Sequence, residues 1–340
     1  MRTTSTFMKS AAVLSVAGLA LTACGDGDGD GGGSDAVEEH CSGEGDQGEI
    51  TIGVFSGWEE GIAASELWNC ILTAEGYDVT LEEAEAGPVF SGLASGDYDL
   101  NLDVWQPVTH ASYIEDYGDT LEEYGSWYDD AELTIAVNED APIDSLEELA
   151  DNADEFGNTI VGIESGAGLT GVTEDEVIPT YGLEDMDFTT SSTPAMLSEL
   201  QTATDNDENI VVTLWHPHWA YEAFPIKDLE DPEGTLGDAE TLSVFGREGF
   251  SDDHPEVAEW MENFEMDAEL LYDLENEMFN EAEEDADYEE IVADWVSENQ
   301  DYVDGLTEGG DGDDADSDDD AEDAEDTEDA EDEDSEGEEN

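Results

Sequence analysis

Apolar and polar positions in the first half of the chain alternate between a strand pattern and a helix pattern. Residues 50–55 are rich in β-branched side chains, which favours a strand. Residues 59–75 space their apolar side chains as one face of a helix does. Further strands are expected at residues 76–81 and 98–104. Strands that alternate with helices predict an α/β fold, with a mainly parallel sheet covered by helices on both faces.

The same order of elements returns in the second half. Residues 159–163 predict a strand, residues 164–168 a glycine-rich turn, and residues 173–181 a helix. A helix capped near Pro194 follows, and then a strand over residues 210–214. Ligands of open α/β sheets bind beyond the carboxyl ends of the strands. We therefore expect two lobes with a ligand cleft between them.

The repeated pattern also sets the expected domain boundaries. Residues 133–137 are predicted to cross from the first lobe to the second, and the chain is predicted to return near residue 241. Lobe 1 is accordingly expected to comprise residues 49–134 and 242–306, and lobe 2 residues 135–241.

Two clusters of tryptophan, proline and histidine lie at the ends of predicted strands. They are DVWQPVTH at residues 103–110 and LWHPHW at residues 214–219. Tryptophan is large and costly to leave in water, so its placement at strand ends predicts the walls of a pocket. A tryptophan face combines apolar contact with a negative quadrupole. Such a pocket suits a cation that has no N–H donors.

The N-terminal residues have the features of an export signal. Residues 1–23 combine a basic start with an apolar stretch that is too short to span a bilayer. Leu-Thr-Ala-Cys, ending at Cys24, resembles the lipobox of bacterial lipoproteins, which implies cleavage before Cys24 and its acylation. The other interpretation is an ordinary signal with an incidental cysteine. Residues 24–48 are rich in Gly and Asp and predict a flexible tether.

Two further cysteines, Cys41 and Cys70, remain after Cys24. An exported chain permits disulfides, so we expect a Cys41–Cys70 bridge that pins the tether to the folded domain.

The charge of the chain is extreme. It has 98 acidic and 4 basic side chains, a formal net charge of −94. Contact with nucleic acid or with anionic lipid is therefore not expected. Residues 307–340 form an acidic tail that cannot build a core and is predicted to be disordered. Repulsion on this scale becomes tolerable when the screening length falls to about 3 Å in 1 M salt, so we infer a salt-loving bacterium.

Four separated motifs and a fifth short segment occur in a specific order. They are GWEE at 57–60, DVWQPVTH at 103–110, GIESGAGL at 162–169, WHPHW at 215–219 and DLEDP at 228–232. Together they resemble the glycine betaine-binding proteins of ABC importers, over residues 49–306. The resemblance implies a two-lobed, type II-like periplasmic-binding-protein fold that closes on its ligand by hinge bending, and no enzymatic activity, cofactor or metal. It also implies a monomer, lipid-anchored on the extracellular face of the cell membrane, that serves an ABC permease and ATPase.

The resemblance also implies site residues. Three tryptophans would form the box around a trimethylammonium group: Trp58, Trp105 and Trp215. His110 would donate to the ligand carboxylate, and the glycine-rich turn would add the backbone N–H groups of Gly168 and Leu169.

Other functions remain open. Carnitine, proline betaine or choline could replace glycine betaine, although choline has no carboxylate for His110 and the Gly168 turn. A metal-dependent hydrolase could use His110, His216 and His218, but the chain has no His-Glu-X-X-His or Cys-X-X-Cys spacing. A passive surface protein whose tail binds cations would explain residues 307–340 but not the ordered motifs.

Overall fold

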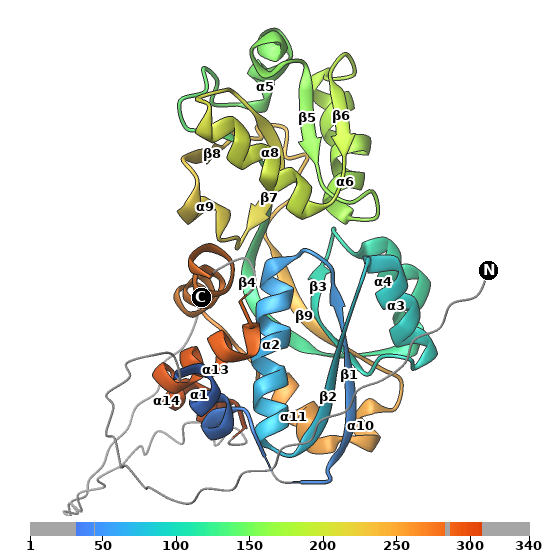
Figure 1. The fold of residues 1–340 in the computed structure, drawn as a ribbon. Coiled ribbons are helices and arrows are strands. Elements are labelled where there is room, and N and C mark those ends of the chain that lie inside the picture. The colour runs from blue at the N-terminus through green and yellow to red at the C-terminus, as the bar shows by residue number, and fades with distance from the viewer. Residues whose placement is uncertain (1–31, 44, 283–285, 308–340) are drawn as a thin grey trace, which may run out of the picture.

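The computed structural model describes residues 32–43, 45–282 and 286–307 (Figure 1). The expected signal peptide, the lipidation site Cys24 and all but the first residue of the acidic tail lie outside this part of the chain. Within it, no helix is both long enough and apolar enough to cross a bilayer.

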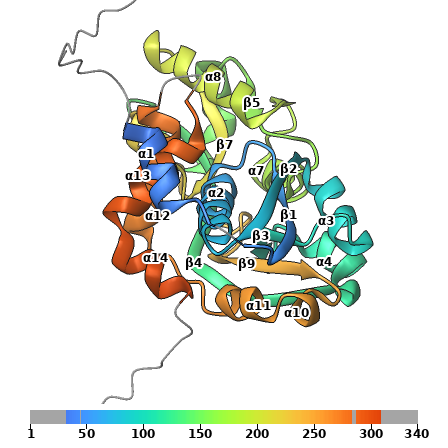
Figure 2. The same ribbon diagram turned by 60° about the horizontal axis from the view of Figure 1, so that its bottom comes forward.

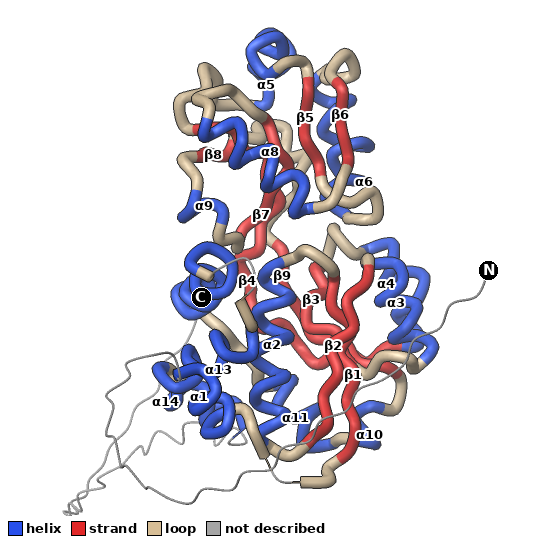
Figure 3. Tube along the Cα trace, viewed as in Figure 1, coloured by secondary structure: helices blue, strands red, loops and turns tan. Residues whose placement is uncertain are grey.

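The described residues form two α/β lobes that lie end to end (Figures 1 and 3). One long strand, β4 (Leu121–Asn138), belongs to both. The other strands of lobe 1 are β1 (Gly48–Phe55), β2 (Tyr77–Ala84), β3 (Leu100–Gln106) and β9 (Glu240–Arg247). The other strands of lobe 2 are β5 (Thr159–Gly162), β6 (Asp187–Thr190), β7 (Val211–His216) and β8 (Ile226–Asp228).

Helices cover both lobes. Those of lobe 1 are α1 (Gly32–His40), α2 (Glu59–Ala74), α3 (Ala86–Ser95), α4 (Ala111–Tyr117), η1 (Gly118–Thr120), α10 (Phe250–Asp253), α11 (Pro255–Glu262), α12 (Ala268–Glu275), η4 (Asn276–Glu281), α13 (Tyr288–Glu298) and α14 (Gln300–Thr307). Those of lobe 2 are α5 (Leu146–Leu149), η2 (Ala150–Phe156), α6 (Gly168–Val172), η3 (Thr173–Val177), α7 (Ile178–Tyr181), α8 (Thr193–Asp205) and α9 (Ala220–Ala223). Ser192 caps α8 by accepting a hydrogen bond from the N–H of Ala195, as the sequence predicted.

The strands form one continuous mixed sheet in the order β2-β1-β3-β9-β4-β7-β5-β6, with β8 on β4. Only the outer three strands of each lobe are parallel: β1 with β2 and β3, and β5 with β6 and β7. The expectation of mainly parallel sheets is therefore wrong for the middle strands. The chain leaves lobe 1 along β4 and returns along β9, so these two strands run in opposite directions and pair antiparallel.

The chain changes lobes in the middle of β4. Ala131 of β4 pairs with Glu240 of β9, whereas the next residue, Glu132, pairs with His216 of β7. The return passes from β8 to the start of β9, which lies beside this point. Two adjacent strand segments thus connect the lobes, and the carboxyl ends of β1, β3 and β5 face the space between them (Figure 1).

The core of lobe 1 is built on α2. Its residues Leu67, Trp68 and Leu72 are fully buried, and the ring of Trp68 packs edge to face on Phe264, with 5.4 Å between ring centroids. Burial of such side chains provides most of the favourable free energy of folding. This packing holds the N-terminal end of α2 rigidly at the boundary between the lobes.

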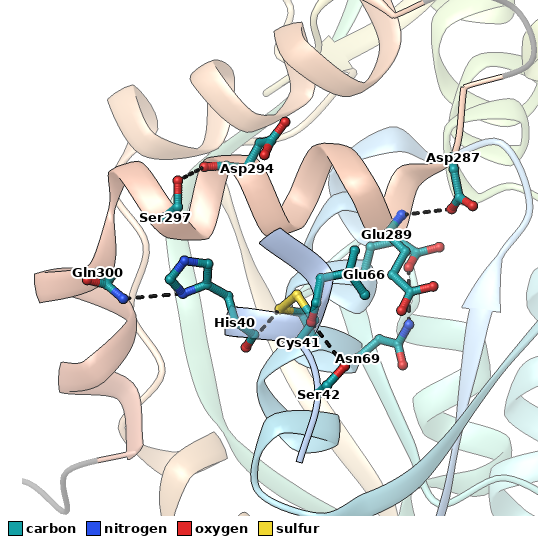
Figure 4. Close-up of a disulfide and its surroundings, with 12 residues drawn as sticks. His40, Cys41, Ser42, Glu66, Asn69, Asp287, Glu289, Asp294, Ser297 and Gln300 are labelled. Carbon is teal, nitrogen blue, oxygen red and sulfur yellow. Dashed lines mark hydrogen bonds between the residues drawn. A yellow bond between two sulfur atoms is a disulfide. The ribbon is translucent and has the colours of Figure 1, made fainter. Parts of the chain in front are cut away.

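The N-terminal segment differs from the expected tether. Residues 32–40 form helix α1, which lies beside α13 in both views of the fold (Figures 1 and 2). Ala36 and Val37 pack into the core, so even a Gly-rich and acidic segment finds enough apolar contact here to be ordered. A disulfide between Cys41 and Cys70 fixes the end of α1 to α2, and Gln300 of α14 lies 3.2 Å from the ring of His40 (Figure 4).

Candidate functional site

A cavity with an empty volume of about 270 Å³ lies where the two lobes meet. Lobe 1 contributes four lining residues: Trp58, Glu60, Trp105 and Thr109. The part of the chain from β4 to β7 contributes six: Leu133, Ile163, Ala167, Gly168, Leu169 and Trp215.

Three tryptophans reach this cavity from three separate elements. Trp58 is the residue before α2, Trp105 lies in β3, and Trp215 lies in β7 opposite Leu133 of β4. Each of these residues is no more than 6 % exposed. In both Trp-X-Pro motifs the peptide bond before proline is cis. Because these three tryptophans come from different elements, the lining is aromatic on several sides. Leu133 and Ile163 add aliphatic contact.

Two of the tryptophans are held by their N–H edges. The indole of Trp105 donates to Asp103 at 2.9 Å and to Glu60 at 3.2 Å. The indole of Trp215 donates to the other carboxylate oxygen of Glu60, at 2.9 Å. A ring fixed through its edge can present its face to a ligand without losing a buried hydrogen bond.

Three acidic side chains are buried around these indoles, and one of them, Glu60, is part of the cavity lining. Glu60, Asp103 and Glu275 are at most 1 % exposed. Burial, more than any neighbouring charge, raises the pKa of Glu60 to about 8 and holds the pKa values of Asp103 and Glu275 well above their usual range. Glu60 can therefore take up or release a proton near neutral pH.

His110 does not line the cavity, because its ring lies behind Trp58 and is fully buried. Its Nδ1 accepts a hydrogen bond from the N–H of Trp105 at 2.9 Å, so its hydrogen is on Nε2. Burial lowers the pKa of His110 to about 3, and the ring is neutral at neutral pH. Its Nε2 finds no hydrogen-bond partner among the described residues.

The glycine-rich turn touches the opposite lobe. A Cβ atom on Gly168 would lie 2.1 Å from the carbonyl oxygen of Thr109, so no larger residue fits there. Gly168 and Leu169 begin α6, and the first N–H groups of a helix have no partner within the helix. Their N–H groups are thus available to an anionic group in the cavity.

Several contacts join the two lobes around the cavity. The hydroxyl of Tyr113 in α4 donates to the carbonyl of Gly166 at 3.0 Å. A carboxylate oxygen of Glu59 lies 3.3 Å from Nε2 of His218, and both side chains are buried. The lobes are therefore closed on each other in this structure.

The three histidines considered as metal ligands lie in separate environments. His216 contacts Asp228 at 2.9 Å and Tyr272 at 3.2 Å, whereas His218 faces Glu59 and His110 stacks on Trp58. In the described ranges, no three His, Cys, Asp or Glu side chains are grouped as metal ligands would be.

Five of the six predicted ligand-binding residues thus line one cavity, and the sixth, His110, stands behind it. Sequence reasoning missed five lining residues: Glu60, Thr109, Leu133, Ile163 and Ala167. Four of them were visible only as parts of motifs: Glu60 in GWEE, Thr109 in DVWQPVTH, and Ile163 and Ala167 in GIESGAGL.

Residues 48–298 match the family model described as the substrate-binding domain of ABC-type glycine betaine transport systems. The chain belongs to this family. The family consists of binding domains of transporters and not of enzymes. The solved structures below share its two-lobed fold, as the motifs predicted.

A curated relative and two solved structures illustrate the similarity. The glycine betaine/carnitine transport binding protein GbuC of Listeria monocytogenes is 36 % identical over 171 residues, which cover 50 % of this chain and 54 % of GbuC. The match therefore spans about half of that relative. Lactococcal OpuAC in its closed form with glycine betaine is 25 % identical, with a TM-score of 0.71 over 76 % of this chain and 99 % of OpuAC. ProX, the glycine betaine/L-proline-binding protein of Borrelia burgdorferi, is 27 % identical, with a TM-score of 0.70 over 75 % and 95 % of the two chains.

Proposed function

We propose that this protein captures glycine betaine, or a closely related betaine, outside the cell and delivers it to an ABC permease and its ATPase. One observation carries the proposal: tryptophans from both lobes line a single cavity, and the residues that begin helix α6, whose first N–H groups have no partner within the helix, lie in the same lining. A quaternary ammonium group has no N–H to donate, so it is bound best by aromatic faces that surround it.

The opposite end of the ligand is a carboxylate. The N–H groups of Gly168 and Leu169 can donate to it, because they begin a helix and lie in the cavity lining. His110 stacks on Trp58 and carries a neutral Nε2–H that has no hydrogen-bond partner among the described residues. A small shift of its ring would bring this N–H to the ligand carboxylate. These donors favour a betaine over choline, which carries a hydroxyl in place of the carboxylate.

Titration calorimetry in molar salt tests this function. We expect glycine betaine to bind, proline betaine and carnitine to compete with it, choline to bind more weakly, and glycine not to bind. Glycine is the matched control because it keeps the carboxylate and lacks the methyl groups. If glycine bound as well as glycine betaine, the aromatic cage would have no role in recognition.

We also propose that the protein acts as a monomer, lipid-anchored at Cys24 on the extracellular face of the membrane. The lipobox-like residues 21–24 support the anchor. A Cys24→Ala variant should be released into the medium, while the parent stays with the cells. Retention of this variant, with the acidic tail also deleted, would show that another segment holds the protein.

A further inference from the structure

We infer that Glu60 is the positioning residue that sets two walls of the cavity against each other and supplies the negative charge that faces the bound cation. The inference rests on the proposed function. It assigns a role to Glu60, which belongs to the GWEE motif but had no role predicted from the sequence.

The geometry is a bridge across the lobe boundary. One oxygen of the Glu60 carboxylate accepts the indole N–H of Trp105 from lobe 1, at 3.2 Å, and the other accepts that of Trp215 from lobe 2, at 2.9 Å. When Glu60 is ionised, its carboxylate has two acceptor oxygens and nothing to donate, so it satisfies both indoles at once. A side-chain amide could satisfy only one, because its nitrogen would face the second N–H.

The bridge exists only when the lobes are closed, because Trp105 and Trp215 belong to different lobes. Glu60 itself is anchored in the first turn of α2, whose positive end favours a carboxylate. Glu60 therefore links the orientation of two aromatic walls to closure.

Charge gives Glu60 a second effect. Among the described residues that line the cavity, Glu60 alone has an ionisable side chain. The groups packed against it are Glu59 of the same helix, Asp103 of β3 and Glu275 of α12, all acidic. The ring of His218 lies against Glu59, with 3.3 Å between its Nε2 and a carboxylate oxygen. The main causes of the pKa of Glu60 are burial, hydrogen bonds and the charge of Glu59, so a cationic ligand would bring a positive charge that these neighbours do not supply.

The consequence is a linkage between ligand binding and proton release. Burial raises the pKa of Glu60 to about 8 in the empty protein, so much of it is protonated at neutral pH. A quaternary ammonium group nearby favours the ionised form and lowers that pKa. Affinity should then rise with pH through the neutral range and level off above about pH 8. Each unit by which the ligand lowers the pKa corresponds to about a tenfold gain in affinity over that range.

The test is calorimetry with glycine betaine from about pH 6 to about pH 10, in pairs of buffers that differ in ionisation enthalpy, which reports the protons released. The parent should release protons near neutral pH and bind about tenfold more tightly at the upper end. Glu60→Gln, nearly the same shape, should weaken binding more than about tenfold and make the profile flat. Glu60→Asp keeps the charge but is too short to bridge both indoles, so it should bind weakly and keep the pH dependence.

Glu66→Gln is the matched control. Glu66 lies on the same helix, its pKa is also raised by burial, and it is not part of the cavity lining. Its replacement should leave affinity and pH profile unchanged.

A Glu60→Gln protein with the affinity and profile of the parent would overturn the inference. So would a parent that binds glycine betaine without releasing protons, whether or not the variants fold. A parent that binds no quaternary ammonium compound would instead refute the proposed function.

Discussion

The ring of His110 lies almost parallel to the indole of Trp58, with 5.5 Å between their centroids and 13° between their planes. Through its Nδ1, His110 also accepts the backbone N–H of Trp105. One buried, neutral imidazole therefore supports two of the three tryptophans, and its burial should be detectable in the pH dependence of stability.

We expect His110 to destabilise the fold as the pH falls below about 6.5, the ordinary pKa of histidine. The folded ring resists protonation down to about pH 3, whereas the unfolded ring takes up a proton from pH 6.5 downward. At about pH 5 this costs about 2 kcal/mol. A His110→Gln variant cannot take up this proton. Its melting temperature, although lower overall, should depend less on pH between about 3.5 and 6.5. Parallel melts of the two proteins with identical pH slopes would refute this prediction.

The hydrogen bond between Tyr113 and Gly166 offers a test of lobe closure. Tyr113→Phe removes only the hydroxyl that reaches the opposite lobe. Because one such bond contributes about 0.5–1.5 kcal/mol, ligand release should become about two- to tenfold faster, with little change in melting temperature. Stopped-flow tryptophan fluorescence measures the release rate. Tyr117→Phe on the same helix is the control and should release ligand at the parental rate.

The Cys41–Cys70 disulfide should affect stability and not affinity. It closes a segment with a sequence separation of 29, for which the chain-entropy model gives about 3.6 kcal/mol. A Cys41→Ala, Cys70→Ala double variant should therefore melt at a lower temperature and bind glycine betaine as the parent does. A reducing agent should lower the melting temperature of the parent and leave that of the variant unchanged.

Salt should act on the fold more than on the site. With 98 acidic and 4 basic side chains, repulsion is strong in dilute buffer, where the Debye length is about 30 Å at 0.01 M. Melting temperature should rise steeply toward molar salt. Glycine betaine has no net charge and binds in a desolvated cavity, so its affinity should change much less. Strong loss of affinity at high salt with unchanged melting would point to a cationic ligand drawn in by the acidic surface.

The sequence was informative where a residue type is rare or a pattern repeats. Trp58, Trp105 and Trp215 could be singled out because each follows or ends an apolar strand run, and the two Trp-X-Pro motifs do converge on one cavity. The glycine-rich turn was identifiable for a similar reason, because Gly168 occupies a place where the opposite lobe leaves no room for a side chain.

Other features depend on contacts between distant segments. Glu60 is one of 98 acidic residues, and its local sequence does not distinguish it from Glu59 or from any exposed carboxylate. Its burial follows from the packing of α2, β3 and β7 together. The helix at residues 32–40 was missed because its composition favours a tether, and its order depends on α13 and on the disulfide. The antiparallel middle strands follow from the return of the chain between lobes, which strand patterns do not encode.

The most direct test of the central claim is titration of glycine betaine into Trp105→Ala, compared with the parent and with Trp260→Ala. Trp105 lines the cavity, whereas Trp260 is a half-buried residue of α11 outside it. A desolvated cation–aromatic contact contributes about 0.5–2 kcal/mol, and lost packing adds to it. We therefore expect Trp105→Ala to weaken binding more than about tenfold and Trp260→Ala to bind as the parent does. A folded Trp105→Ala protein that bound glycine betaine as tightly as the parent would contradict the assignment of this cavity as the binding site.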